Sequence, residues 1–366
     1  MHRWSALTRP FQPDPEGLID NILRRGTPKR VHFIELFQDW EVVHAIAERF
    51  ELLKGVQPGD PDFNRKLYIA VQRFCGYDFV RVGLADMVWP LHGQVVEDTT
   101  SALKHTAGRR YQDEHTGPIM SWADFEKYPW PNPDSPSATR ELEWYSANLP
   151  ADMCIIGSGA FGHIAEYLQW LMGYETLCFA LFDQRDLVAA IARKLEEIYS
   201  ASLKRILEFP RVRIAWASDD MGFRTGLMIS PDDTREFILK GHKHLAAMAH
   251  AAGRPYLLHA CGNLSDIINT LIDDVKIDGK HSFEDTIENV CDAKRGYGAR
   301  TALLGGIDVD FMCRADENAI RKRVRTTCET CMPGGGFCLG TGNSVANYIP
   351  LDNYLAILDE GRRFSG

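Results

Sequence analysis

Eight short apolar runs recur along this chain of 366 residues, and segments with helical spacing separate most of them. A short apolar run bounded by turn residues predicts a strand that is buried on both faces of its sheet. Strands that alternate with helices favour a parallel sheet, and eight such strands predict a (β/α)8 barrel, the TIM-barrel fold. The predicted strands are residues 30–37, 77–83, 153–157, 213–218, 256–261, 275–283, 301–307 and 336–340.

The segments outside these runs divide the rest of the chain. Several predicted helices begin with Asp and end with Gly, as helix termini prefer. Residues 1–29 are polar and contain prolines, which predicts an N-terminal extension before a single barrel domain of residues 30–366. Residues 84–137 are rich in Trp, Pro and Gly and predict a long insertion or lid after the second strand. The predicted helices are residues 39–50, 62–75, 161–173, 186–207, 232–252 and 317–331.

The composition, 45% hydrophobic and 25% charged, is that of an ordinary globular protein. A net charge of −9 argues against binding to nucleic acid or to an anionic membrane, because both need concentrated Lys and Arg. The chain lacks an apolar stretch long enough for a membrane helix, and its first residues lack the apolar run of a signal peptide. Nine scattered cysteines favour reduced thiols. We therefore expect a cytoplasmic protein, with a homo-oligomer left open.

A candidate zinc site lies at the ends of the predicted strands. His259 and Cys261 are two positions apart at the end of residues 256–261, so both side chains face the same side. Cys338, at the end of another strand, supplies a third soft ligand. One imidazole and two thiolates with an open fourth position predict a catalytic zinc ion, whereas the alternative is a core histidine with two small buried thiols. Glu284 is the candidate fourth ligand.

Other polar residues also follow the strands, where barrel enzymes build their sites. Asp219 and Asp220 point opposite ways in extended chain, so one can orient a ligand histidine or move a proton while the other caps the next turn. Solvated loop carboxylates are the alternative for both, and ordinary packing is the alternative for the insertion's tryptophans. The candidate catalytic residues are Asp219, Asp220 and Glu35. Glu35 is also the second choice for the carboxylate ligand of the zinc ion. The candidate substrate-binding residues are His281, Asp308, Asn343, Trp89 and Trp122.

Two motifs suggest other functions but lack the context that these functions need. Residues 157–162 match the G-x-G-x-x-G dinucleotide fingerprint, yet they follow the third strand and no acidic residue ends a second strand beyond them. Tight turning of the chain explains these glycines. Cys328 and Cys331 have the spacing of a metal-binding pair, but they end a predicted helix and no second pair exists, so we interpret them as reduced thiols. His242 lies in a helix and is expected at the surface.

At His259, Cys261 and Cys338 the chain resembles the zinc-dependent, corrinoid-linked methyltransferases of the uroporphyrinogen decarboxylase superfamily, whose zinc ligands would fall on these residues. Residues 219–226, 280–285 and 339–350 are similar to the O-demethylase methyltransferases of methoxylated aromatics. The decarboxylases carry basic side chains near the first strand to bind substrate carboxylates. This chain has Glu35 there, so a porphyrinogen substrate is not expected.

The resemblance implies transfer of a methyl group from a methoxylated aromatic compound to the Co(I) corrinoid of a partner protein. That protein would dock at the C-terminal face of the barrel. Zinc, or a proton donor beside it, would neutralise the oxyanion of the departing phenolate. The same zinc could bind a thiol and lower its pKa, so methyl transfer from a methylcorrinoid protein to a thiol is the alternative, followed by decarboxylation. A metal-bound scaffold or sensor would instead have a closed four-ligand site and no cavity.

Overall fold

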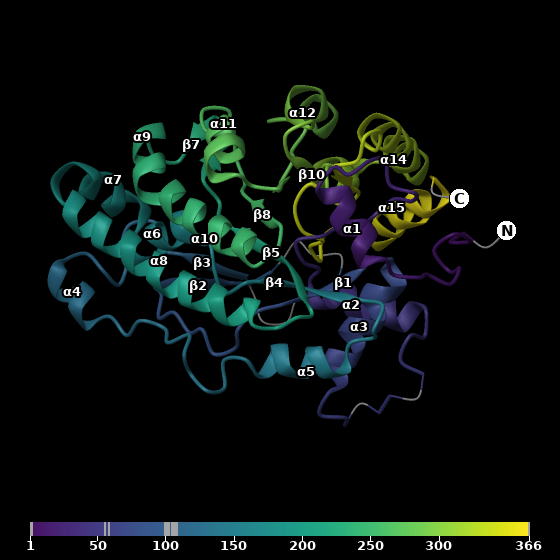
Figure 1. Ribbon diagram of the computed structural model, residues 1–366, viewed down its shortest axis with the longest axis horizontal. Helices are drawn as coiled ribbons and strands as arrows, with labels where there is room; N and C mark the ends of the chain where they lie inside the picture. The colour runs from purple at the N-terminus through teal and green to yellow at the C-terminus, as the bar shows by residue number, and fades with distance from the viewer. Residues whose placement is uncertain (1–2, 55, 58, 99–102, 104–108, 365–366) are drawn as a thin grey trace.

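The computed structural model describes residues 3–54, 56–57, 59–98, 103 and 109–364. Within them, one curved sheet of seven strands is parallel throughout (Figure 1). Every one of its strands overlaps a predicted strand, because a strand covered on both faces is apolar along its whole length. The order across the sheet is β1 (Phe79–Val82), β4 (Cys154–Ser158), β5 (Val212–Ser218), β8 (Tyr256–His259), β9 (Gly279–His281), β10 (Ala302–Leu304) and β11 (Phe337–Cys338).

The first predicted strand, residues 30–37, extends this sheet through isolated bridges. Phe33 pairs in parallel with Leu339, and Gln38 pairs with Val345. The amide of Ile34 donates to the carbonyl of Leu339 at 2.9 Å, so the segment lies beside the end of β11. The predicted TIM-barrel class is therefore confirmed, with one irregular strand beside the seven regular ones.

Helices cover the outer surface of the sheet, and most of the predicted helices form (Figure 1). The predicted helix at residues 232–252 is divided into α9 (Pro231–Asp233), a π-helical turn (Thr234–Leu239) and α10 (Lys240–Ala251). A second π-helical turn, Leu271–Val275, follows α11 (Ile268–Thr270). The other helices of the barrel are α2 (Trp40–Arg49), α3 (Phe63–Cys75), α5 (Arg140–Asn148), α6 (Ile164–Met172), α7 (Tyr174–Asp183), α8 (Arg185–Leu207), α12 (Val290–Tyr297), α13 (Val309–Arg314), α14 (Glu317–Cys331) and α15 (Leu351–Phe364).

The N-terminal extension packs against the end of the barrel chain. Its helix α1 (Pro15–Ile22) begins at Asp14, whose side chain accepts a hydrogen bond from the Gly17 amide. The Asn21 side chain donates to the carbonyl of Phe337 at 2.6 Å, which attaches α1 to β11. Nearer the terminus, the amides of Ala6 and Leu7 donate to one oxygen of Asp359 in α15, and α1 lies beside α15 in Figure 1.

The insertion at residues 84–137 contains an antiparallel hairpin of β2 (Gly93–Val96) and β3 (Arg109–Gln112), followed by the short helix α4 (Trp122–Lys127). The Trp89 ring contacts those of Tyr167 in α6 and Tyr199 in α8, with ring centres 4.3 and 6.0 Å apart. These contacts fix the start of the insertion to the outer helices. A second small hairpin, β6 (Gly222–Phe223) with β7 (Gly226–Leu227), follows β5.

The core consists of two clusters of buried residues. Along β5 the buried side chains alternate between them: Ile214 and Trp216 belong to one cluster, and Ala215 and Ala217 to the other. This is the period of two that a strand imposes. Polar side chains on the inner face of the strands therefore point into the barrel.

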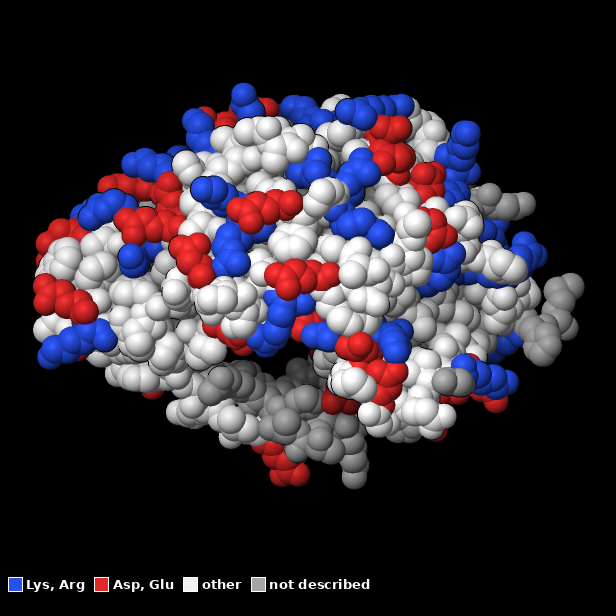
Figure 2. All heavy atoms as spheres, turned by 60° about the horizontal axis from the view of Figure 1, so that its bottom comes forward, with Lys and Arg blue, Asp and Glu red and all other residues white. Residues whose placement is uncertain are grey.

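The surface carries charges of both signs. Figure 2 shows Lys and Arg side chains interspersed with Asp and Glu over the face that it presents, with a hollow near the centre of that face. Among the described residues, no helix combines the length and the apolar character that crossing a bilayer requires.

A buried carboxyl predicts a pH dependence of stability. Glu35 is 4% exposed and accepts hydrogen bonds from the Thr341 amide at 2.8 Å and the Thr341 hydroxyl at 2.5 Å. Burial raises its pKa from 4.5 to about 8, against the effect of these hydrogen bonds. Because the folded state holds this proton more tightly than the unfolded state, the Glu35 contribution to stability falls as the pH rises from about 4.5 to about 8.

We therefore expect Glu35→Gln to raise the free energy of unfolding near pH 8, by an amount on the order of 2 kcal/mol, and to change it much less near pH 5. Urea unfolding measured across this pH range is the test. Glu48→Gln removes a carboxylate from an exposed position and serves as the control. Identical pH profiles for Glu35→Gln and the unmodified protein would contradict the assignment.

Candidate metal centre

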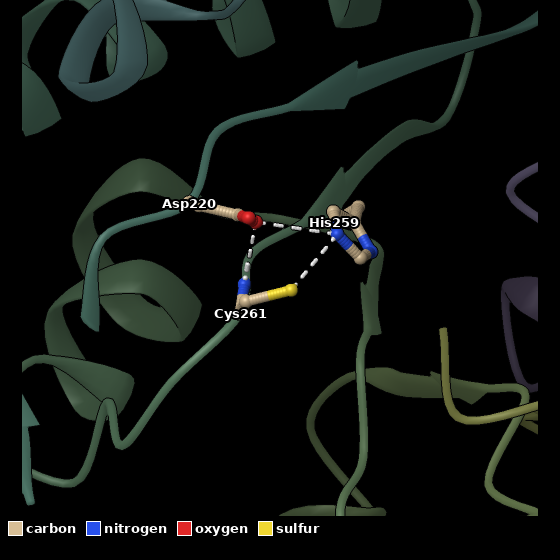
Figure 3. Close-up of side chains that lie close together, drawn as sticks. All are labelled: Asp220, His259 and Cys261. Carbon is tan, nitrogen blue, oxygen red and sulfur yellow. Dashed lines mark hydrogen bonds and ion pairs between the residues drawn. The ribbon is translucent and has the colours of Figure 1, made fainter. Parts of the chain in front are cut away.

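Asp220, His259 and Cys261 meet at the C-terminal ends of β5 and β8 (Figure 3). Their potential ligand atoms all lie within 4.8 Å of one another. His259 Nε2 is 3.3 Å from an oxygen of Asp220 and 3.3 Å from the sulfur of Cys261. The two strands are neighbours, and Ser218 pairs with His259, so the residues that follow them are brought together. The structure thus joins Asp220 to the predicted pair of His259 and Cys261.

The two loops that carry these ligands approach each other closely. The Cys261 amide donates to Asp220 Oδ1 at 2.9 Å, and the Gly222 amide donates to the Cys261 carbonyl at 3.1 Å. Gly262 has a positive φ of 94°, and a Cβ atom there would lie 2.1 Å from the Gly222 carbonyl. Glycine is therefore required at position 262 for this approach.

His281 orients the ring of His259 from behind. Their Nδ1 atoms are 2.7 Å apart, and His281 is fully buried. Burial, with the nearby charges of His259 and Lys280, holds the pKa of His281 well below its usual value, so its ring is neutral. If Nδ1 of the neutral His281 accepts a hydrogen bond from the Nδ1–H group of His259, then Nε2 of His259 is left free as a ligand atom. His281 was predicted to bind substrate, but this position makes it a partner of the ligand histidine.

Two side chains contact the sulfur of Cys261. Asn343 Nδ2 lies 3.3 Å from it, and the hydroxyl of Ser282 lies 3.6 Å from it. Burial and the Asp220 carboxylate raise the pKa of the Cys261 thiol. Burial also opposes the ionisation of Asp220, but the hydrogen bond and charge of His259 outweigh it and lower the pKa of Asp220 to about 2. Without a cation the thiol keeps its proton.

This donor set fits a zinc ion. A carboxylate oxygen, an imidazole nitrogen and a thiolate sulfur are all zinc ligands, and catalytic zinc sites have three protein ligands and an open position. His259 is 3% exposed, while Asp220 and Cys261 are only partly buried, so the cluster is reached from one side. A divalent cation would balance the charges of Asp220 and a Cys261 thiolate.

Cys338, the predicted third ligand, is not brought to this cluster. Its sulfur is buried and lies 3.4 Å from Asn21 Nδ2 in α1. The strands of a barrel are tilted from its axis, so residues that pair across several neighbouring strands lie at different heights along that axis. Cys338 therefore lies deeper than His259, and Asn343, farther along the same chain segment, is the residue that reaches Cys261. Asp220 takes the place that the sequence reasoning gave to Cys338.

The adjacent carboxylates of Asp219 and Asp220 contact different parts of the structure. Asp219 is fully buried and accepts hydrogen bonds from the amides of Ala165 and Glu166, at 2.9 and 3.0 Å, in the first turn of α6. It also lies 2.7 Å from His242 Nε2. Asp219 is thus a helix cap and not a catalytic residue of the cluster. His242 is buried because it pairs with Asp219, so the expectation of a surface position was wrong.

The remaining predicted residues lie outside the cluster. Glu284 lines two other cavities, of about 190 and 680 Å³, and burial and the Asp308 and Asp220 carboxylates raise its pKa. Asp308 caps α13 through the Phe311 amide and also accepts from the Asp285 amide. Both oxygens of Glu35 are taken by Thr341. Trp89 packs on the outer helices. The Trp122 ring contacts the Phe125 ring, and its residue is 43% exposed.

A cavity of about 610 Å³ opens beside the cluster, at the C-terminal ends of β1, β4 and β5. Ser218, the strand partner of His259, is one of its lining residues. Its aromatic lining residues lie in the first barrel segment and in α2, α3 and α5. The sequence had instead suggested aromatic residues of the insertion for this role. Helical periodicity alone could not distinguish these aromatic residues from core residues. They are Phe37, Trp40, Tyr68 and Tyr145.

His163 also lines this cavity, and no sequence pattern indicates it, because it lies in the turn before α6. Its Nδ1 atom is 2.7 Å from a carboxylate oxygen of Glu166. Burial lowers the pKa of His163, but the Glu166 hydrogen bond and the Asp219 and Asp220 carboxylates outweigh it and raise the pKa. The cavity therefore contains a histidine that keeps its proton to a higher pH than an ordinary imidazole does.

The ligand assignment predicts different metal contents for matched cysteine variants. Protein purified under reducing conditions with zinc should hold about one zinc per chain, and Cys261→Ser and Asp220→Ala should lose most of it. Cys338→Ser should keep it, because that sulfur contacts Asn21 and not the cluster. Elemental analysis after dialysis measures all of these variants. Zinc loss in Cys338→Ser with retention in Asp220→Ala would contradict the assignment.

The two neighbouring aspartates should also differ in their effect on stability. Asp219→Ala leaves two helix amides and His242 without their buried acceptor, so we expect the free energy of unfolding to fall by about 2–4 kcal/mol. Asp220→Ala in metal-free protein should cost clearly less, because Asp220 is 35% exposed. Denaturant unfolding in the presence of a chelator compares them. Equal losses would contradict the separate roles.

Comparison with known proteins identifies the family. The model of the uroporphyrinogen decarboxylase (URO-D) family matches residues 114–364, more than half of the chain. Among solved structures, a methyltransferase from Methanosarcina mazei has a similar fold, with a TM-score of 0.69 and 17% sequence identity over 97% of this chain and 100% of that chain. A search of curated proteins found no match. The chain belongs to the uroporphyrinogen decarboxylase family, as its sequence motifs indicated.

Proposed function

We propose that this protein is a zinc-dependent methyltransferase that removes the methyl group of a methoxylated aromatic compound and delivers it to the Co(I) corrinoid of a partner protein. The observation that carries the proposal is the cluster of Asp220, His259 and Cys261 beside a cavity with aromatic walls. The name of the Methanosarcina mazei neighbour, a methyltransferase of the same fold, supports the reaction class.

The chemistry requires help at the ether oxygen. The bond between the methyl carbon and oxygen breaks, its electron pair stays on oxygen, and the methyl group passes to the corrinoid, which is a co-substrate. A phenolate is a poor leaving group unless its developing charge is neutralised. Zinc held by Asp220, His259 and Cys261 would supply a Lewis acid for that oxygen.

The residues of the cavity supply the binding and the proton. Trp40, Tyr68 and Tyr145 offer ring faces and edges to an aromatic substrate, and the volume of about 610 Å³ is typical of a small-molecule site. Protonated His163, held by Glu166, is the proton donor that we assign to the leaving oxygen. The corrinoid protein would approach at the C-terminal ends of the strands, since the cavity lies there.

The test combines the protein with zinc, Co(I) cobalamin and a panel of methoxybenzenes. We expect methylcobalamin, seen by its absorption spectrum, to form in equal amount with the demethylated phenol. His259→Ala and Cys261→Ser should lower the rate by about 100-fold or more, and Cys338→Ser should retain it. Methylcobalamin consumed by a thiol, with no reaction of any ether, would instead establish the thiol methyltransferase alternative.

The proton donor predicts a pH profile. Because the pKa of His163 is raised, the protonated form persists to a higher pH than in an ordinary histidine and is lost as the pH rises through that pKa. The rate with an aryl ether should therefore fall on the alkaline side. His163→Gln should be slower, and its rate should lose this alkaline decline. An unchanged pH profile in His163→Gln would remove His163 from this role.

A further inference from the structure

One arginine inside the barrel differs from its neighbours in having no acidic partner. Arg81 lies on β1, and its guanidinium stacks over the Trp216 ring at 4.6 Å. Its Nε atom is buried without a hydrogen-bond partner, and within the described part of the chain no carboxylate lies at ion-pair distance. By contrast, Arg65 in the nearby helix α3 pairs with both Asp62 and Glu141. A buried cation without a partner is costly in a folded protein.

Arg81 faces the proposed substrate cavity. It is one of the lining residues, together with the aromatic side chains of Trp40, Tyr68 and Tyr145. The cavity also contains Glu141, which shares Arg65 with Asp62, and His163, which pairs with Glu166. Ser158 and Ser218 contribute neutral hydroxyl groups. Among the described charged residues that line the cavity, Arg81 is thus the one without an oppositely charged partner, and burial lowers its pKa only to about 10, so the guanidinium stays charged near neutral pH.

The surroundings of Arg81 have an excess of hydrogen-bond donors. The indole nitrogen of Trp216, on which Arg81 stacks, is also buried without a partner. The Trp216 ring also contacts the His281 ring, with ring centres 5.4 Å apart, and the His281 ring contacts that of His259. Trp216 and His281 therefore connect Arg81 to the proposed metal ligand His259.

We propose that Arg81 binds a carboxylate of the substrate, and that the natural substrates are methoxylated aromatic acids. A planar guanidinium matches the two oxygens of a carboxylate, and a carboxylate brings only acceptors to a region that offers donors. The choice of a methoxylated acid rests on the proposed methyl transfer, while the anion recognition rests on Arg81 alone.

The first test measures binding without any methyl acceptor. Zinc-loaded protein is titrated calorimetrically with para-methoxybenzoate and with the neutral para-methoxybenzyl alcohol. We expect the acid to bind about tenfold or more tightly than the alcohol. Arg81→Gln should remove this preference, Arg81→Lys should keep part of it, and Arg295→Gln, which removes an exposed charge, should leave it unchanged. Equal affinities in the unmodified protein, or a preference that survives in Arg81→Gln, would overturn the proposal.

The second test asks whether Arg81 has a structural role instead. Removal of an unpaired buried charge should leave the melting temperature of Arg81→Gln equal to or above that of the unmodified protein. Addition of para-methoxybenzoate should raise the melting temperature of the unmodified protein only. A large loss of thermal stability in Arg81→Gln would make Arg81 a structural residue and contradict the proposal.

These measurements also separate the two proposals. A preference for the acid that depends on Arg81, with no methyl transfer from any ether, would retain the anion site and reject the proposed function. Methyl transfer from neutral ethers alone, with no preference for acids, would retain the function and reject the role of Arg81.

Discussion

The register between β5 and β8 decides which side chains reach the metal centre. Ser218 pairs with His259, so the next residues of both strands leave the sheet side by side. Side chains alternate in direction, and Asp220 therefore reaches His259 and Cys261 while Asp219 reaches the first turn of α6. A slip of one residue would exchange the two carboxylates and remove both the cap and the ligand. The cluster and the adjoining helix thus depend on the same strand pairing.

Charge balance then limits what the cluster can hold. The pKa of Asp220 is lowered and that of the Cys261 thiol is raised. When no cation is near, Asp220 therefore carries the negative charge and the thiol stays protonated. The neutral His281 behind His259 and the polar side chain of Asn343 beside the sulfur orient the ligands without adding charge. A divalent cation would allow all three donors to ligate together. Arg81, which stacks on Trp216, gives the cavity a cation that has no carboxylate partner among the described residues.

Much of the fold could be predicted because buried parallel strands are apolar along their length. The seven regular strands overlap the predicted runs, and α14 matches its predicted limits. The irregular pairing of residues 30–37 could not be foreseen, since local apolar character does not fix hydrogen bonding. At the site, the pair of His259 and Cys261 followed from strand geometry. The position of Cys338 could not be predicted in the same way, because its height along the barrel axis depends on the tilt of the strands.

Other residues of the site carried too weak a signal in the sequence. Arg81 lies in a predicted strand, and only the structure shows that it lacks an acidic partner. His163 lies in a turn, and its value as a proton donor depends on Glu166 and on carboxylates from β5. The aromatic residues Trp40, Tyr68 and Tyr145 of the cavity lie on helices, where the pattern of a core and that of a binding surface are the same. Pairing between distant segments determines each of these features.

The central claim is that Asp220, His259 and Cys261 hold one metal ion. The most direct test is a crystal structure of the zinc-loaded protein with anomalous diffraction recorded on both sides of the zinc absorption edge. We predict a single strong peak in contact with a carboxylate oxygen of Asp220, Nε2 of His259 and the sulfur of Cys261. A peak bound by Cys338, or none inside the barrel, would contradict it.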